Sequence, residues 1–137
     1  MSGLTAAHEL IKNNWEVIIL DKGRGVGGRM ATRRAGEARF DHGAQYFSTK
    51  TADFRAFTQK IIQKNIAKEW NLQEGDKTFS HPRVIGINGM NTIPKFLAEG
   101  LNIKTNEKVI SISEIENGCK VSTEAGNFYE ANALICT

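Results

Sequence analysis

The residues of this chain best suited to chemistry lie between positions 21 and 29, where an acid is followed by a glycine-rich loop ending in arginine. The segment reads Asp21-Lys22-Gly23-Arg24-Gly25-Val26-Gly27-Gly28-Arg29. A carboxylate at the end of a strand accepts hydrogen bonds from ribose hydroxyls. Paired glycines let the backbone approach a diphosphate closely, and an arginine offers it a forked donor. The segment therefore indicates a nucleotide-binding loop.

Gly3 adds a second sign of dinucleotide binding, because it directly precedes a predicted helix. The dinucleotide fingerprint G-x-G-x-x-G lies between the first strand and the first helix, with an acid about 20 residues further on. Asp21 follows Gly3 by 18 residues, which suits Gly3 as the third glycine. We therefore expect the chain to start inside its fingerprint, with the first strand missing ahead of Met1.

Positive charge gathers in the same part of the chain. The net charge is +3, and five arginines lie between residues 24 and 39. Such a cluster favours phosphate-bearing partners, so one alternative is a non-catalytic module that binds a nucleotide or nucleic acid through Arg24–Arg39. The region lacks interleaved aromatic residues, and the glycine pair fits a diphosphate better. We therefore expect no nucleic-acid partner.

Composition sets the broad class of the protein. The chain has 137 residues, 40% of them hydrophobic and 24% charged, which suits one folded domain. Two cysteines and three histidines argue against a disulfide scaffold and against a metal site. Neither a membrane-spanning run nor a signal peptide is evident, so we expect a cytoplasmic protein without membrane contact.

Local patterns predict alternating helices and strands, followed by a meander. We expect helices over residues 4–14, 51–65 and 91–99, with Thr51 as an N-cap and Gly100 as a C-cap. Residues 71–77 indicate a turn. Apolar patterns predict strands over 16–21, 103–105, 108–115, 119–123, 127–131 and 133–136, with a hairpin at Asn117-Gly118. Residues 79–87 indicate an extended segment interrupted by Pro82. The first and last strands read as buried parallel strands. The order predicts an α/β fold with an antiparallel insertion.

Several segments resemble one family in order and spacing. The Asp21–Arg29 loop is similar to that of flavoprotein amine oxidases. Phe40-Asp41-His42-Gly43-Ala44-Gln45-Tyr46-Phe47 resembles the segment of renalase and related FAD-dependent amine oxidase-like proteins that passes beside the flavin ring. Residues 86–91 resemble the family's glycine turn, 107–109 its adenine-contacting strand, and 133–137 the strand returning to the nucleotide sheet.

The resemblance implies a Rossmann-like FAD/NAD(P)-binding domain with a parallel sheet and an antiparallel β-meander insertion. Residues 1–137 would be part of that domain, without the substrate domain and the C-terminal flavin-binding segment. The whole enzyme would move a hydride from an amine or reduced nicotinamide, NAD(P)H, to FAD and then pass electrons to oxygen. We expect this chain to bind the ADP part of FAD, to be inactive alone, and to self-associate through an exposed sheet edge.

The same resemblance and the loop chemistry give a set of cofactor-binding residues. The set is Gly3, Asp21, Lys22, Arg24, Gly27, Gly28, Arg29, Met30, Gly43, Ala44, Gln45 and Val109. Arg33 and Arg34 are interpreted as surface charge or as part of a substrate-side rim, rather than as cofactor ligands. His42 is of a residue type that often serves as a general base, but hydride transfer to a flavin does not require one. No catalytic side chain is therefore assigned.

Overall fold

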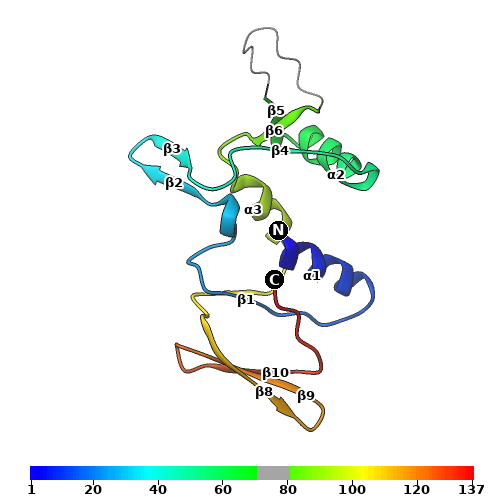
Figure 1. Ribbon diagram of the computed structural model, residues 1–137, viewed down its shortest axis with the longest axis vertical. Helices are drawn as coiled ribbons and strands as arrows, with labels where there is room; N and C mark the ends of the chain where they lie inside the picture. Colours follow the sequence, from blue (N-terminus) through cyan, green and yellow to red (C-terminus); the bar gives the residue numbers. More distant parts are fainter. Residues whose placement is uncertain (71–80) are drawn as a thin grey trace. The chain divides into compact units, whose positions relative to one another are not determined.

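The computed structural model describes residues 1–70 and 81–137, which form two compact units (Figure 1). The first unit joins Met1–Val26 to Leu97–Thr137, and the second is Gly27–Phe96. The predicted turn over 71–77 lies outside the described residues. Among the described residues, no helix is both long and apolar enough to cross a membrane.

The first unit contains a parallel strand pair and a helix. Helix α1 (Ser2–Lys12) buries Leu4 and Ala7, because these two residues fall on one face. Strand β1 (Ile19–Asp21) pairs in parallel with β7 (Ile103–Thr105), so that Asp21 lies opposite Thr105. The carboxyl ends of both strands therefore meet at one edge. The other edge of β1 has no partner strand among the described residues, and self-association through it stays a prediction.

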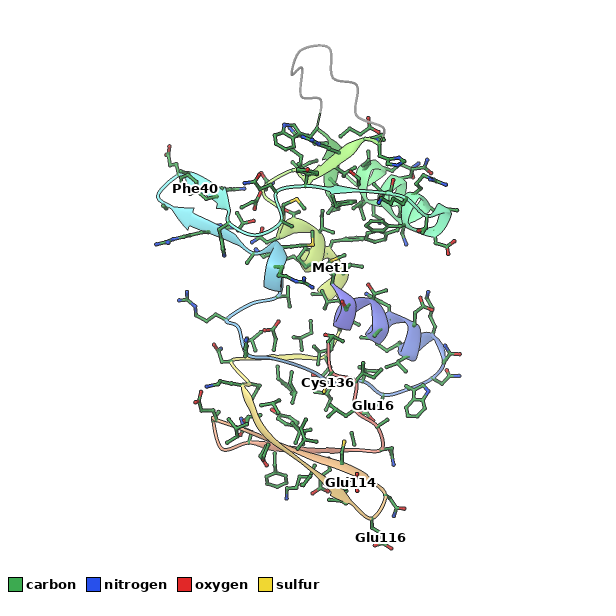
Figure 2. All side chains as sticks on the ribbon, in the orientation of Figure 1. Met1, Glu16, Phe40, Glu114, Glu116 and Cys136 are labelled. Carbon is green, nitrogen blue, oxygen red and sulfur yellow. The ribbon has the colours of Figure 1, made fainter. Side chains whose placement is uncertain are left out.

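An antiparallel meander completes the first unit and confirms the predicted insertion. Strands β8 (Val109–Ile115), β9 (Gly118–Thr123) and β10 (Phe128–Ala131) lie in the order β10-β9-β8. The predicted hairpin turn is present, with Glu116 and Asn117 in the loop (Figure 2). Gly118 has φ of 149°, and a Cβ there would lie 2.1 Å from the Ala131 carbonyl oxygen. Only glycine fits this position.

The second unit is a small sheet covered by helices. Strands β4 (Phe47–Ser48), β6 (Arg83–Gly86) and β5 (Ala67–Glu69) are antiparallel in that order. Helix α2 (Ala52–Gln63) begins after Thr51, whose hydroxyl accepts the Phe54 amide, as the sequence predicts. With α3 (Thr92–Ala98), these elements enclose a core. The fully or nearly fully buried core residues are Ile61, Ala67, Val84, Met90 and Ile93.

A β-hairpin that the sequence analysis missed projects from this unit (Figure 1). It follows a short 3₁₀ turn over Gly28–Met30 and consists of β2 (Thr32–Ala35) and β3 (Ala38–Asp41). Gly36, with φ of 59°, makes the two-residue turn together with Glu37. Both strands are largely exposed, including the Phe40 ring (Figure 2).

Two strand predictions need correction. Residues 133–136 form no strand, and Leu134 and Ile135 are exposed, because no described strand runs beside them. An apolar run becomes a buried strand only where neighbours pair with it and cover it. For the same reason the predicted strand over 16–21 is regular only at Ile19–Asp21, and Ile18 is 46% exposed.

Candidate functional site

Asp21 holds together two loops of the first unit that follow β1 and β7. Its Oδ1 accepts the Gly23 amide at 2.7 Å, which closes a tight turn after the strand. Its main-chain oxygen accepts the Glu107 amide at 3.0 Å, and the Asn106 amide donates to the Gly23 carbonyl at 2.9 Å. The loop after β1 therefore lies directly beside the segment 106–109.

Several predicted cofactor residues at this edge of the first unit are exposed. The Asp21 side chain is half-buried, and no described residue donates to its second carboxylate oxygen. Lys22 and Arg24 are exposed, and Val109 is 39% exposed at the start of β8. The structure thus brings four predicted cofactor residues to neighbouring loops. A carboxylate with a free oxygen beside exposed cations suits a ribose hydroxyl next to a phosphate.

Glu107 is a buried carboxylate in the same region, and its role was not predicted. Asn127 donates to Glu107 Oε1 at 2.6 Å. Hydrogen bonding from Thr123 lowers the pKa of Glu107 below its ordinary value, with smaller contributions from Asn127 and Tyr129, although burial opposes the shift. Burial and the charge of Glu107 in turn raise the pKa of Tyr129. Through Asn127, Glu107 therefore attaches to the meander the segment 107–109, which resembles the family's adenine-contacting segment.

Gly3 lies in the first turn of α1. A Cβ at this position would lie 3.1 Å from the Thr137 hydroxyl, so the two ends of the chain are close together (Figure 1). The helix begins at Ser2, so Gly3 lies inside it and not, as the sequence predicts, directly before it. No described contact ties Gly3 to Asp21, so its part in a phosphate loop stays a prediction.

A second group of predicted residues gathers at the start of the second unit. Gly27 and Gly28 have φ of 142° and 50°, a backbone conformation that favours glycine. The Gly27 carbonyl accepts the Met30 amide at 2.8 Å, which forms the 3₁₀ turn carrying Arg29. The Arg29 side chain is exposed. The paired glycines thus shape a tight turn that presents a guanidinium to its surroundings.

This turn touches the segment predicted to pass beside a flavin. The Ala44 amide donates to the Arg29 carbonyl at 2.8 Å. A Cβ on Gly43 would lie only 2.0 Å from the same oxygen, so only glycine allows this approach. Met30 and Ala44 both pack against the core of the unit, while His42 and Gln45 are exposed. Two segments that the sequence assigns separately to diphosphate and flavin are therefore neighbours.

A polar network that the sequence analysis missed lies at the base of the hairpin. The Thr32 hydroxyl donates to Asp41 Oδ1 at 2.5 Å, and the Met90 amide donates to the same oxygen at 2.9 Å. The Asn91 amide donates to the Thr32 hydroxyl at 3.1 Å. Asp41 and Met90 are 49 residues apart in the sequence, so spacing alone gave no signal for this contact.

The predicted site residues thus form two groups. Asp21, Lys22, Arg24 and Val109 lie together in the first unit. Arg29, its glycine turn and residues 43–45 lie together in the second. A shared dinucleotide cradle formed by both groups stays a prediction.

Two family models match successive parts of the chain. Residues 1–61 match the family model of the NAD(P)-binding Rossmann-like domain, and residues 54–137 match that of flavin-containing amine oxidoreductases. Polyamine oxidase 4 of Oryza sativa subsp. japonica is 40% identical over 84 residues. Those residues are 61% of this chain but 16% of that protein, so the chain spans a small part of the relative.

A solved structure supports the fold. A protein named as an FAD-containing monooxygenase from Photorhabdus luminescens subsp. laumondii aligns with a TM-score of 0.58 and 16% identity. The alignment covers 95% of this chain and 35% of that protein. At this identity the likeness concerns the fold alone, which is a Rossmann-like, mixed α/β arrangement. The longer family match covers most of the sequence, and the chain therefore belongs to the flavin-containing amine oxidoreductase family.

Proposed function

We propose that this chain binds the ADP part of FAD within an amine oxidase-like oxidoreductase. The observation that carries the proposal is the 2.8 Å hydrogen bond between the Ala44 amide and the Arg29 carbonyl. It joins the turn suited to a diphosphate to the segment that resembles a flavin-adjacent one. The family match supports a flavin as the cofactor.

The residues present fit such a group. The diphosphate requires close backbone approach and a cation, and Gly27, Gly28 and the exposed Arg29 offer both. The ribose requires an acceptor, and Asp21 keeps one carboxylate oxygen without a described donor. The adenine would lie along the backbone near Val109, which Glu107 anchors to the meander.

The chain's own residues bind and orient, while the flavin, when bound, supplies the hydride-accepting chemistry. Asp21 would hold the ribose and Arg29 the diphosphate. Gly43, Ala44 and Gln45 would set the position of the ring system. In this proposal the substrate is an amine or a reduced nicotinamide, and oxygen is the final electron acceptor. The resemblance of residues 40–47 favours a renalase-like branch of the family.

An FAD titration of this chain tests the proposal. Replacing Arg29 with alanine removes a charge-assisted contact with the diphosphate, which is worth about 1.5–3 kcal/mol. We therefore expect FAD to bind about ten- to a hundredfold more weakly. Arg34→Ala is the matched control, because it removes the same charge from an exposed strand of the hairpin.

Three outcomes would count against this assignment. If Arg29→Ala and Arg34→Ala weakened binding equally, the cation would act through general charge only. If the unchanged chain bound no FAD, the proposed function would fail. Binding of single-stranded nucleic acid at the same arginines, without FAD binding, would instead favour the non-catalytic nucleic-acid-binding module.

A further inference from the structure

Thr32 and Asp41 face each other at the base of the β2–β3 hairpin. They are partners in the strand register, and the Thr32 hydroxyl donates to Asp41 Oδ1. The same carboxylate oxygen accepts the Met90 amide, and the Thr32 hydroxyl accepts the Asn91 amide. One hydroxyl therefore acts as donor and acceptor at once, and it joins the hairpin to a distant turn.

That turn is packed tightly against the hairpin base. Gly89 has φ of 101°, and a Cβ there would lie 2.6 Å from the Thr32 hydroxyl oxygen. The next residue, Met90, is fully buried in the core of the unit. The hairpin base is thus attached to a buried core residue of the second unit rather than held by its own strands alone.

The attachment lies between the two cofactor segments of this unit. Thr32 follows Met30 by two residues, and Asp41 precedes Gly43 by two residues. The hydrogen bond from the Ala44 amide to the Arg29 carbonyl joins the same two segments at a second point. The Arg29 turn and residues 43–44 are therefore held together at two points, by the Ala44–Arg29 hydrogen bond and by the Thr32–Asp41 pair with its bonds to Met90 and Asn91.

We propose that Asp41 and Thr32 act as positioning residues that hold the Arg29 turn and the Gly43–Ala44 segment in register for a flavin dinucleotide. This inference rests on the proposed function. Neither side chain contacts the ligand in this account; both act through the backbone that they fix. A site held by such supporting hydrogen bonds loses affinity when its parts shift by a fraction of an ångström.

A hydroxyl at position 32 is essential to this arrangement. Valine has nearly the shape of threonine but cannot donate to Asp41 or accept from Asn91. Serine keeps both functions. Thr32→Val should therefore weaken FAD binding by about tenfold or more, and Thr32→Ser should bind within about twofold of the unchanged chain.

Thr58→Val is the matched control for a lost threonine hydroxyl. Thr58 is 5% exposed in the same unit, and its hydroxyl donates to the Phe54 carbonyl within α2 at 2.8 Å. This variant should lower thermal stability while leaving FAD affinity within about twofold. Asp41→Asn provides a second variant in which the acceptor oxygen remains but its charge is lost.

Asp41→Asn separates geometry from charge. Loss of a negative charge by itself would strengthen binding of an anionic diphosphate, whereas weaker hydrogen bonds to Met90 and Thr32 would loosen the cradle. We expect FAD to bind about threefold more weakly. Unchanged or stronger FAD binding by folded Asp41→Asn would overturn the inference. This test still applies if Thr32→Val fails to fold.

The experiment combines FAD titration with two other readouts on the same chain. Thr32→Val should change the visible circular dichroism of bound flavin, and it should speed hydrogen exchange at the Ala44, Met90 and Asn91 amides of the flavin-free chain. Thr32→Ser should restore both. Equal affinity and equal flavin spectra in Thr32→Val and Thr58→Val would overturn the inference alone. Absence of FAD binding by the unchanged chain would overturn the proposed function and this inference with it.

Discussion

Replacing Gly43 with alanine should disrupt the contact on which the proposed site depends. The added Cβ would lie 2.0 Å from the Arg29 carbonyl oxygen and 2.9 Å from its carbon. Ordinary contact begins at 3.4 Å, so the oxygen and the new Cβ must separate by about 1.4 Å. The Arg29 carbonyl belongs to the backbone and the backbone fixes the position of a Cβ, so no side-chain rotation can relieve the overlap.

The cost follows from two effects. Forced overpacking costs about 1–3 kcal/mol, and loss of the hydrogen bond from Ala44 to Arg29 adds about 0.5–1.5 kcal/mol. Their sum, about 1.5–4.5 kcal/mol, is a large part of the roughly 5–15 kcal/mol that stabilises a typical domain. At about 4 °C per kcal/mol for a chain of this size, the unfolding midpoint should fall by about 6–18 °C.

Gly25→Ala is the control for this measurement. A Cβ at Gly25 meets no atom within 4 Å, so its effect should stay within about 0.5 kcal/mol. Thermal and denaturant unfolding followed by circular dichroism compare the two variants, and FAD titration reports on the site. If Gly43→Ala were as stable as Gly25→Ala and bound FAD as tightly as the unchanged chain, the close approach of the two segments would be wrong.

Two further predictions concern stability. Because the pKa of Glu107 in the folded chain lies below its ordinary value of 4.5, its charge stabilises the fold above that pH. This contribution is lost as the pH falls through the folded-state pKa. Between neutral pH and about pH 3, the free energy of unfolding should therefore fall less in Glu107→Gln than in the unchanged chain. An equal fall in both proteins would contradict the role of this carboxylate. Thr51→Ala should cost about 1 kcal/mol by removing the N-cap of α2, whereas Thr51→Ser should retain it; calorimetry of both variants checks this, and equal midpoints would argue against the cap.

Local signals made the helices and the meander predictable. The spacing of Leu4 and Ala7 marks the buried face of α1, and Thr51 marks the start of α2. Gly100, with φ of 77°, follows α3 at the predicted C-cap. Each of these features depends on residues within a few positions, which is the range that periodicity and capping report.

The hairpin and the polar network depend on contacts that sequence spacing does not report. Strands β2 and β3 carry exposed arginines instead of alternating apolar residues, so only Gly36 signalled a turn. Asp41 meets its partner Met90 across 49 positions, and Glu107 meets Asn127 across 20. A buried carboxylate is stable only with donors supplied by the tertiary fold.

The predicted cofactor residues fall between these two cases. Gly27, Gly28 and Arg29 were found because glycine pairs and arginine have direct chemical uses, and the structure gives the glycines the expected backbone freedom. The approach of Gly43 to Arg29 was not evident from chemistry alone. It became visible only through the geometry of the folded second unit.

The first unit is assembled from two stretches of chain that flank the whole second unit, and this affects the order of events during synthesis. Strand β1 leaves the ribosome well before its partner β7, so its hydrogen-bonding edge stays unpaired while residues 27–96 emerge. The continuous second unit can complete its core in that interval. We expect the nascent N-terminal segment to wait for residues 103–105, exposed meanwhile to proteases and to holding chaperones.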